Sequence, residues 1–126
     1  MYNPATDTWT ARSFTEGPGN RSVATFLSHP SYPDTKAILF FGEKSPSNDG
    51  HNAAGTFWDD IWIYDFVGDM WERAIIENGH FLNDGGLGWA SGAVVEGENP
   101  ATVVIWGGLN ERNERFGMGW KILIGR

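Results

Sequence analysis

The chain has 126 residues, a length that fits one domain of ordinary size better than two. Its net charge of −7 repels phosphate backbones and anionic lipid surfaces, so we expect neither nucleic acid nor a membrane as a partner. Cysteine is absent, which excludes disulfide bonds, thiolate metal sites and cysteine nucleophiles and favours a cytoplasmic location. The sequence also predicts no membrane span and no signal peptide, since it has neither a long apolar run nor a charged-then-apolar leader.

The composition predicts an all-β chain. Aromatic residues make up 14% of the sequence, and 17 glycines and 6 prolines are spread along it. Bulky aromatics favour strands, whereas glycine and proline favour the tight turns between strands. No stretch has apolar residues at the spacing of an amphipathic helix, so short strands are expected throughout.

The predicted strands follow one another at short intervals. The runs at 37–42 and 102–108 are continuously apolar and end in glycine, as strands buried on both faces do. Segments rich in Gly, Pro, Asn and Asp separate the strands. In chain order, strands are expected within residues 2–11, 21–27, 37–42, 57–65, 70–76, 89–95 and 102–108, with a last strand that begins at Gly119.

Landmark residues recur in the two halves of the sequence. Tyr2 and Trp9 return as Tyr64 and Trp71 at the same spacing, and an aspartate lies two positions before each tryptophan. The apolar runs and the aromatic strands that follow them return at a similar distance. These landmarks agree on a tandem repeat of about 60 residues.

The repeat resembles the kelch repeat of β-propellers. The matching features are a small-residue first strand, an apolar second strand ending in Gly107-Gly108, an aromatic third strand at 62–65, and a tryptophan in the fourth strand. The resemblance covers nearly the whole chain and implies four-stranded antiparallel blades. The first copy departs from the family pattern with Gly42-Glu43, and the repeat exceeds the usual length of about 50 residues because its loops are longer.

The resemblance also implies a packing role for most of the tryptophans. Large flat rings fill the interfaces between neighbouring sheets well. The tryptophans expected to pack between blades are Trp9, Trp62, Trp71, Trp106 and Trp120.

The strand count predicts an incomplete propeller. Residues 21–76 supply one complete blade, residues 1–11 the end of another, and residues 89–124 three strands of a further one. A propeller needs roughly four to eight blades to close. Two explanations are open: the chain is a fragment of a longer propeller, or copies associate so that residues 2–11 of one chain complete the blade at 89–124 of the next. Three copies would then form a homo-oligomer with six blades.

A binding site is predicted on one face of the blades. Strands of a meander alternate in direction, so the loops at 13–20, 43–56, 77–88 and 110–117 share one end, and functional residues concentrate in such loops. These loops are long and polar, and the resemblance implies that they bind a protein or peptide partner. The alternative is an ordinary solvated surface whose charges pair with one another. The residues that we select as partner-binding candidates are Arg21, His51, Asn83, Arg112 and Arg115.

Enzymatic activity is not indicated by these residues. The kelch resemblance includes two kinds of enzyme, galactose oxidase and the specifier-type enzymes. The tyrosine–cysteine copper site of the first cannot form in a chain without cysteine. The iron site of the second requires a spacing that Glu43, Asp49 and His51 do not have. We expect no metal, no cofactor and no catalytic residue. Two alternatives remain: a blade fragment of such an enzyme, or a carbohydrate-binding propeller in which Trp58 or Trp89 stacks on a sugar.

Overall fold

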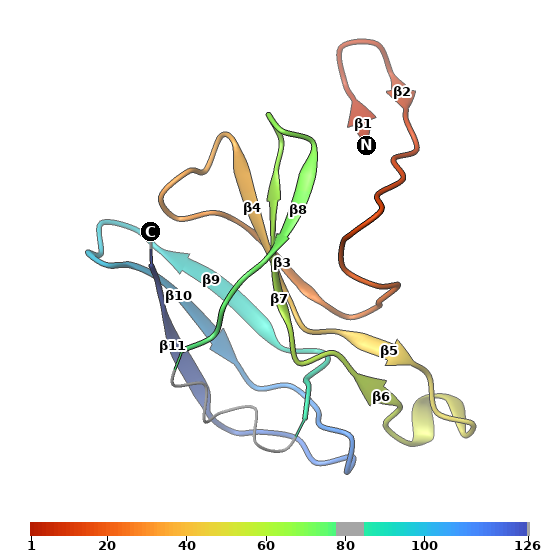
Figure 1. Ribbon diagram of the computed structural model, residues 1–126. Helices are drawn as coiled ribbons and strands as arrows, with labels where there is room; N and C mark the ends of the chain where they lie inside the picture. The colour runs from red at the N-terminus through yellow and green to blue at the C-terminus, as the bar shows by residue number, and fades with distance from the viewer. Residues whose placement is uncertain (78–84, 126) are drawn as a thin grey trace.

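The computed structural model describes residues 1–77 and 85–125, and this part of the chain is all-β with antiparallel sheets and no α-helix (Figure 1). The predicted all-β class is therefore confirmed. Two larger sheets form the body of the molecule, and two short hairpins extend from it. None of the sheets closes into a barrel or a ring.

The first large sheet has four antiparallel strands in the order β3-β4-β7-β8. They are β3 (Thr25–Ser28), β4 (Lys36–Phe40), β7 (Ile61–Asp65) and β8 (Met70–Arg73). Strand β3 begins later than residues 21–27 predict, because Val23 has a φ of 49° that interrupts the extended backbone. The expected strand at 57–65 is also divided, since Phe57 pairs with Glu43 in a separate hairpin before β7 begins.

The second large sheet has three antiparallel strands in the order β11-β10-β9. They are β9 (Ser91–Val95), β10 (Ala101–Trp106) and β11 (Gly119–Ile124). Strand β10 is the central strand, with Ile105 opposite Trp120 on one side and opposite Gly92 on the other.

Two short hairpins flank the large sheets. The opening hairpin pairs β1 (Tyr2–Asn3) with β2 (Thr8–Trp9), and it stands apart from the body of the molecule in Figure 1. The other pairs β5 (Glu43–Ser45) with β6 (Thr56–Phe57), and the 3₁₀ helix η1 (Gly50–Asn52) lies at its tip. The segment predicted as a long loop at 43–56 therefore contains a hairpin.

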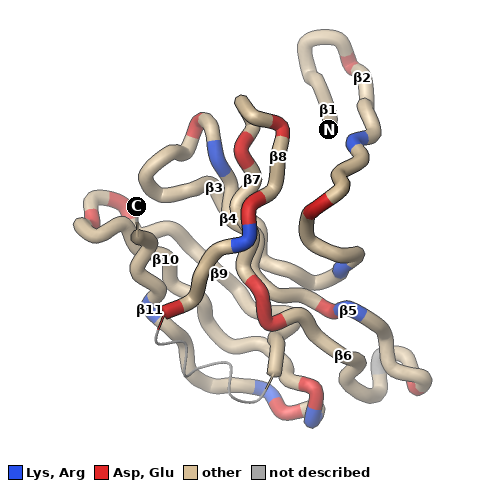
Figure 2. Tube along the Cα trace, viewed as in Figure 1, with Lys and Arg blue, Asp and Glu red and all other residues tan. Residues whose placement is uncertain are grey.

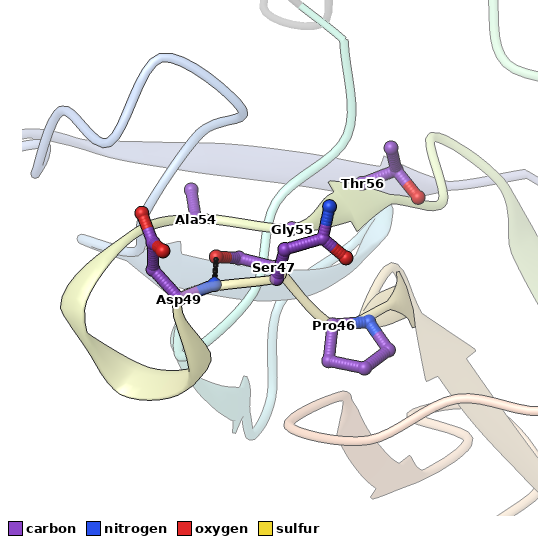
Figure 3. A pocket seen from close by; sticks show the side chains of 7 residues that line it. Pro46, Ser47, Asp49, Ala54, Gly55 and Thr56 are labelled. Carbon is purple, nitrogen blue, oxygen red and sulfur yellow. Dashed lines mark hydrogen bonds between the residues drawn. The ribbon is translucent and has the colours of Figure 1, made fainter.

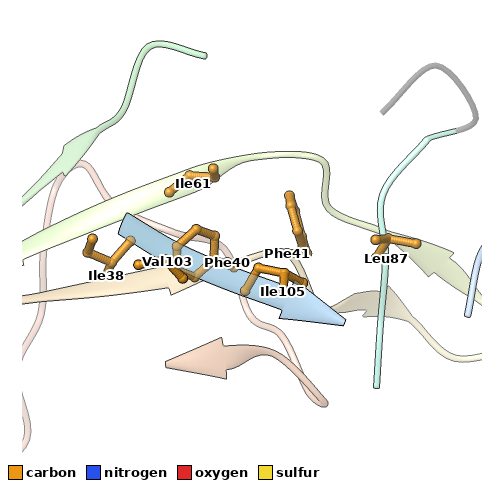
Figure 4. Close-up of a cluster of buried hydrophobic side chains, with 7 residues drawn as sticks. All are labelled: Ile38, Phe40, Phe41, Ile61, Leu87, Val103 and Ile105. Atoms are coloured by element: carbon orange, nitrogen blue, oxygen red, sulfur yellow. The ribbon is translucent and has the colours of Figure 1, made fainter. Parts of the chain in front are cut away.

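The core lies between the two large sheets (Figure 4). Phe40 from β4 and Ile105 from β10 are both fully buried, each 0% exposed. Because residues alternate between the two faces of a strand, one face of β4 and one face of β10 meet in this layer. The buried hydrophobic side chains of this cluster are Ile38, Phe40, Phe41, Ile61, Leu87, Val103 and Ile105.

The tryptophans contribute less to this core than the sequence predicts. Trp62, Trp71 and Trp120 are half-buried, but Trp9 is 80% exposed and Trp106 is 59% exposed. The prediction that all five are packed between sheets is therefore wrong for Trp9 and Trp106. The reason is that no second sheet of the described chain covers the hairpin β1–β2 or the outer face of β10.

The two large sheets have the same backbone conformation where their central strands end. Gly42 and Gly108 have φ angles of 108° and 107°, a region that favours glycine. Each carbonyl accepts a main-chain hydrogen bond from an aromatic residue, Trp58 at 2.8 Å and Phe116 at 3.0 Å respectively. These contacts align the first sheet with the second, so that Gly42 corresponds to Gly108.

The opening hairpin matches the end of the first large sheet. Tyr2 lies opposite Trp9, just as Tyr64 lies opposite Trp71. The sequence repeat that these four residues suggested is therefore also a repeat of backbone pairing.

Candidate functional site

The connections that leave one end of the two large sheets form the predicted binding face. Residues 41–60 link β4 to β7, and residues 107–118 link β10 to β11; both lie toward the lower side of the view in Figure 1. The turns at 29–35 and 66–69 lie at the opposite, upper side. Charged residues of both signs follow one another along the β10–β11 connection (Figure 2).

Asn110 organises the β10–β11 connection. Its side chain is completely buried, and its Oδ1 accepts hydrogen bonds from the main-chain N–H groups of Arg112 and Glu114 at 3.0 and 2.9 Å. Its Nδ2 donates to Glu114 Oε2 at 2.9 Å. A short side chain that bonds to main-chain groups further along the chain is a common device of tight turns, and it holds residues 110–115 in one conformation.

The two predicted arginines of this connection are both exposed. Arg112 Nε donates to Glu114 Oε2 at 2.9 Å, and both side chains are more than half exposed. Arg115 is exposed and forms no ion pair within residues 1–77 and 85–125. An exposed ion pair stabilises a protein by at most about 1 kcal/mol, so a carboxylate of a partner can compete with Glu114 at little cost.

Glu111 fixes this connection against the neighbouring hairpin. Its Oε1 accepts a hydrogen bond from the main-chain N–H of Phe57 in β6 at 2.9 Å. The predicted candidate His51 lies in η1 at the tip of that same hairpin. The structure thus joins the segment that carries Arg112 and Arg115 to the hairpin that carries His51, whereas the candidate Asn83 lies outside the described residues.

An open depression of about 350 Å³ lies in the loop of the β5–β6 hairpin (Figure 3). Asp49 is its one charged lining residue, and the Asp49 N–H donates to Ser47 Oγ at 2.9 Å. Small and polar side chains form the remainder of the lining. This depression offers one carboxylate and a few amide and hydroxyl groups, a set that defines no particular ligand chemistry.

Arg21 lies in an internal network apart from the loop arginines. Its Nη1 donates to Asp60 Oδ1 at 2.7 Å and to the Phe41 carbonyl at 2.8 Å, and both charged side chains are only 5% exposed. Burial raises the pKa of Asp60, but hydrogen bonds from Arg21 and Trp62 together with the positive charges of Arg21 and Arg73 outweigh burial and hold this pKa below its ordinary value. A contact between Arg21 and a ligand stays a prediction.

Two cations lie over one tryptophan ring beside this network. The Arg21 guanidinium is 5.0 Å and the Lys44 ammonium 4.6 Å from the ring centroid of Trp58. The ring is half-buried, and its Nε1 donates to the Asn20 carbonyl at 3.1 Å. Sequence reasoning missed this cluster because no spacing rule connects residues 21, 44 and 58.

The second large sheet has apolar residues at the backbone positions that correspond to Arg21 and Asp60. The Asp60 carbonyl accepts from Phe41 N–H at 3.1 Å, and the Met118 carbonyl accepts from Gly107 N–H at 2.9 Å. Arg21 precedes an isolated bridge between Ser22 and Glu43, just as Leu87 precedes a bridge between Gly88 and Leu109. The two backbone positions that hold a buried ion pair in the first sheet therefore hold two apolar residues in the second, Leu87, which is buried, and Met118, which is 58% exposed.

The described part of the chain contains neither a metal centre nor a helix that could span a membrane. Within the described residues, no group of three or more His, Cys, Asp and Glu side chains could hold a metal ion. In the same part of the chain, no helix is long and apolar enough to cross a membrane. Comparison with models of known protein families and with curated proteins gives no match to this chain.

Proposed function

We propose that the chain is a pair of kelch-type propeller blades that acts as a binding module. In this proposal its loop face recognises a protein or peptide partner that carries carboxylate groups. Arg112 and Arg115 supply the charge that attracts the partner, because arginine binds carboxylates with paired hydrogen bonds. His51 and Asn83 belong to the same predicted face as further contacts.

The internal repeat supports the assignment to blades. A four-stranded meander and a three-stranded meander pack face to face, and their central strands end in glycines of matching conformation, Gly42 and Gly108. In each sheet a tryptophan lies on the strand that follows the apolar one: Trp62 of β7 lies opposite β4, and Trp120 of β11 lies opposite β10. Stacked antiparallel meanders are the building units of a propeller.

The buried side chain of Asn110 is the observation that carries the binding proposal. It fixes a loop on which Arg112 and Arg115 remain exposed, and Glu111 ties that loop to β6. A rigid loop loses little conformational entropy when a partner binds. Positive charge held in place on an otherwise acidic chain also selects partners of the opposite sign.

The experiment is to screen a peptide array in which each acidic peptide is matched by its amide counterpart, Asp to Asn and Glu to Gln. Peptides that bind the chain are then titrated against the variant R112A/R115A. We expect preferential binding of the acidic forms and at least about tenfold weaker binding by the variant.

The matched control is K36A/K121A, which also removes two positive charges. Lys36 forms a half-buried ion pair with Asp65, and Lys121 forms an exposed one with Glu98; both pairs lie away from the loop face. The control should bind acidic peptides as the unmodified chain does. Equal binding by R112A/R115A, with an unchanged circular dichroism spectrum, would remove these arginines from the proposed site.

A further inference from the structure

One edge of the second large sheet lacks a strand that the first sheet has. Strand β7 pairs with β4 on one side and with β8 on the other, whereas β11 pairs only with β10 in the described chain. The two strands hold equivalent places, because Trp62 lies opposite Leu39 in β4 and Trp120 lies opposite Ile105 in β10. The open edge of β11 therefore corresponds to the position that β8 occupies.

The opening hairpin carries a strand of the β8 type, β2, whose one strand partner in the described chain is the two-residue strand β1. Trp71 of β8 is half-buried with its ring 6.3 Å from Phe26 and 6.5 Å from Phe14, whereas the equivalent Trp9 is 80% exposed. In Figure 1 the hairpin lies on the far side of the four-stranded sheet from β11. The hairpin is thus not placed to pair with β11 of its own chain.

Each large sheet also has a face that points away from the shared core, and both of these faces expose large apolar side chains. Phe40 and Trp106 hold equivalent positions, since each lies two residues before one of the aligned glycines, Gly42 and Gly108. Phe40 is fully buried between the sheets, whereas Trp106 is 59% exposed. Leu123 shares the outer face with Trp106 and is 57% exposed. At the other end, Phe26 lies on the face of the four-stranded sheet away from the core and is 54% exposed.

Main-chain hydrogen bonds link the two sheets at the inner ends of their strands. Gly42 N–H donates to the Leu87 carbonyl at 2.8 Å, and Trp89 N–H donates to the Val23 carbonyl at 3.0 Å. Gly108, the equivalent of Gly42, has no such partner for its N–H within residues 1–77 and 85–125. The chain therefore contains one complete sheet-to-sheet interface and the two separated halves of another.

We propose that a second copy of this chain joins these halves. Residues 8–11 of one copy pair with the open edge of β11 in the other, and the outer face that carries Trp106 packs on the face that carries Phe26. The register follows that of β7 with β8, so Trp9 lies opposite Ile122 of the other copy, in the place that Tyr2 holds in the hairpin, and β11 displaces β1 from β2. Gly108 N–H then donates to the carbonyl of the residue equivalent to Leu87, Arg21 of that copy.

The charges of the two segments favour this pairing. Asp7 is the only charged side chain in residues 1–11, and Lys121 is the only one in residues 119–125. The two segments thus carry opposite charges, and like charges do not face each other along the ladder. The interface is head-to-tail, so it closes into a ring if the rotation between copies fits and extends into a chain of copies if it does not.

The test measures the solution mass of the full chain by sedimentation and light scattering over a dilution series. We expect multiples of 14.0 kDa that dissociate on dilution.

The variants W9A and W106E should both raise the concentration of half-dissociation by about tenfold or more, since tryptophans at the centre of interfaces contribute strongly. Leu123→Glu is the second variant on the same face if W106E does not fold. Val67→Ala, whose side chain is as exposed as that of Trp9, is the control and should leave the mass unchanged.

Mixing the two variants distinguishes this interface from other associations. W9A keeps an intact β11 edge and outer face, and W106E keeps residues 8–11 unmodified, so their equimolar mixture should form a species of twice 14.0 kDa and stop there. A mixture that stays at the mass of one chain would overturn the head-to-tail interface. Unmodified chain that stays at 14.0 kDa at every concentration would also overturn it, because these edges would then belong to a different partner. The variant R112A/R115A should assemble normally, so the assembly and the proposed loop-face binding are tested separately.

Discussion

The hydroxyl group of Tyr64 donates a hydrogen bond to the carboxylate of Asp69 across the β7–β8 turn. The opening hairpin repeats this contact between Tyr2 and Asp7 at 2.8 Å. Both aspartates have a φ of 50°, a conformation that short polar residues adopt more readily than others do. The same contact therefore closes two equivalent hairpins, one buried in a sheet and one exposed.

Replacing Tyr64 with Phe should destabilise the protein more than replacing Tyr2 with Phe. Tyr64 is buried, and loss of its hydroxyl removes a hydrogen bond to a charged acceptor, which we expect to lower the free energy of unfolding by about 2 kcal/mol. Tyr2 is exposed, and water can replace its contact. Urea denaturation of both variants measures the difference, and equal effects would contradict a special role for the buried hairpin.

The same contact predicts a loss of stability in alkaline solution. Burial and the hydrogen bond to Asp69 both raise the pKa of Tyr64 above its ordinary value. The folded state therefore favours the protonated phenol, so its contribution is complete below pH about 10 and is lost as the pH rises above that value. Above pH about 10, the free energy of unfolding should therefore fall more steeply with pH in the unmodified protein than in Y64F. Parallel alkaline profiles for the two would show that Tyr64 does not titrate differently in the folded state.

Removing one partner of the buried Arg21–Asp60 pair should be costly, whereas replacing both should not. Asp60→Met leaves the guanidinium buried without its carboxylate, and we expect a loss of about 3 kcal/mol. R21L/D60M should recover most of that loss, because it removes both charges of the buried pair together and leaves none of them unpaired. Thermal unfolding of the single and double variants provides the comparison; a double variant as unstable as the single one would contradict this explanation.

Substitution of Gly42 by Ala should destabilise the first large sheet through two separate effects. Its φ of 108° is unfavourable for alanine, and the added Cβ would lie 2.8 Å from the Ser22 carbonyl oxygen. Gly50→Ala is the control, since Gly50 also has a positive φ but nothing lies within 4 Å of its Cβ position. The control should cost about 1 kcal/mol from strain alone, and Gly42→Ala should cost clearly more in denaturant titrations.

The strand pattern was predictable because it depends on local composition. Apolar runs that end in glycine identified β4 and β10, and the spacing of Tyr64 and Trp71 identified the β7–β8 hairpin. The strand start at Thr25 was not predictable, since no propensity rule gives Val23 a positive φ. That conformation is held by long-range contacts such as the hydrogen bond from Trp89 to its carbonyl.

The candidate site was predictable in place but not in detail. The alternation of strand directions put the loops that carry His51, Arg112 and Arg115 at one end, and they lie there. The pairing of Arg21 with Asp60 was hidden, because the two residues are far apart in the sequence and either could equally have faced solvent. Exposure of Trp9 was hidden for a different reason: composition shows that a ring is apolar, but not whether a second sheet covers it.

Asn110→Ala should separate the shape of the proposed binding loop from its charge. The substitution removes one buried amide that holds the main-chain N–H groups of Arg112 and Glu114, so we expect the free energy of unfolding to fall by about 2 kcal/mol. Both arginines remain, but their loop is no longer fixed, and an acidic peptide should bind several-fold more weakly because it must now order the loop. Arg115→Ala is the complementary variant, which should weaken binding with little change in stability, since its side chain is exposed. Isothermal titration and denaturant unfolding of the two variants measure both quantities. Full peptide affinity in Asn110→Ala would show that recognition does not depend on the conformation that Asn110 imposes.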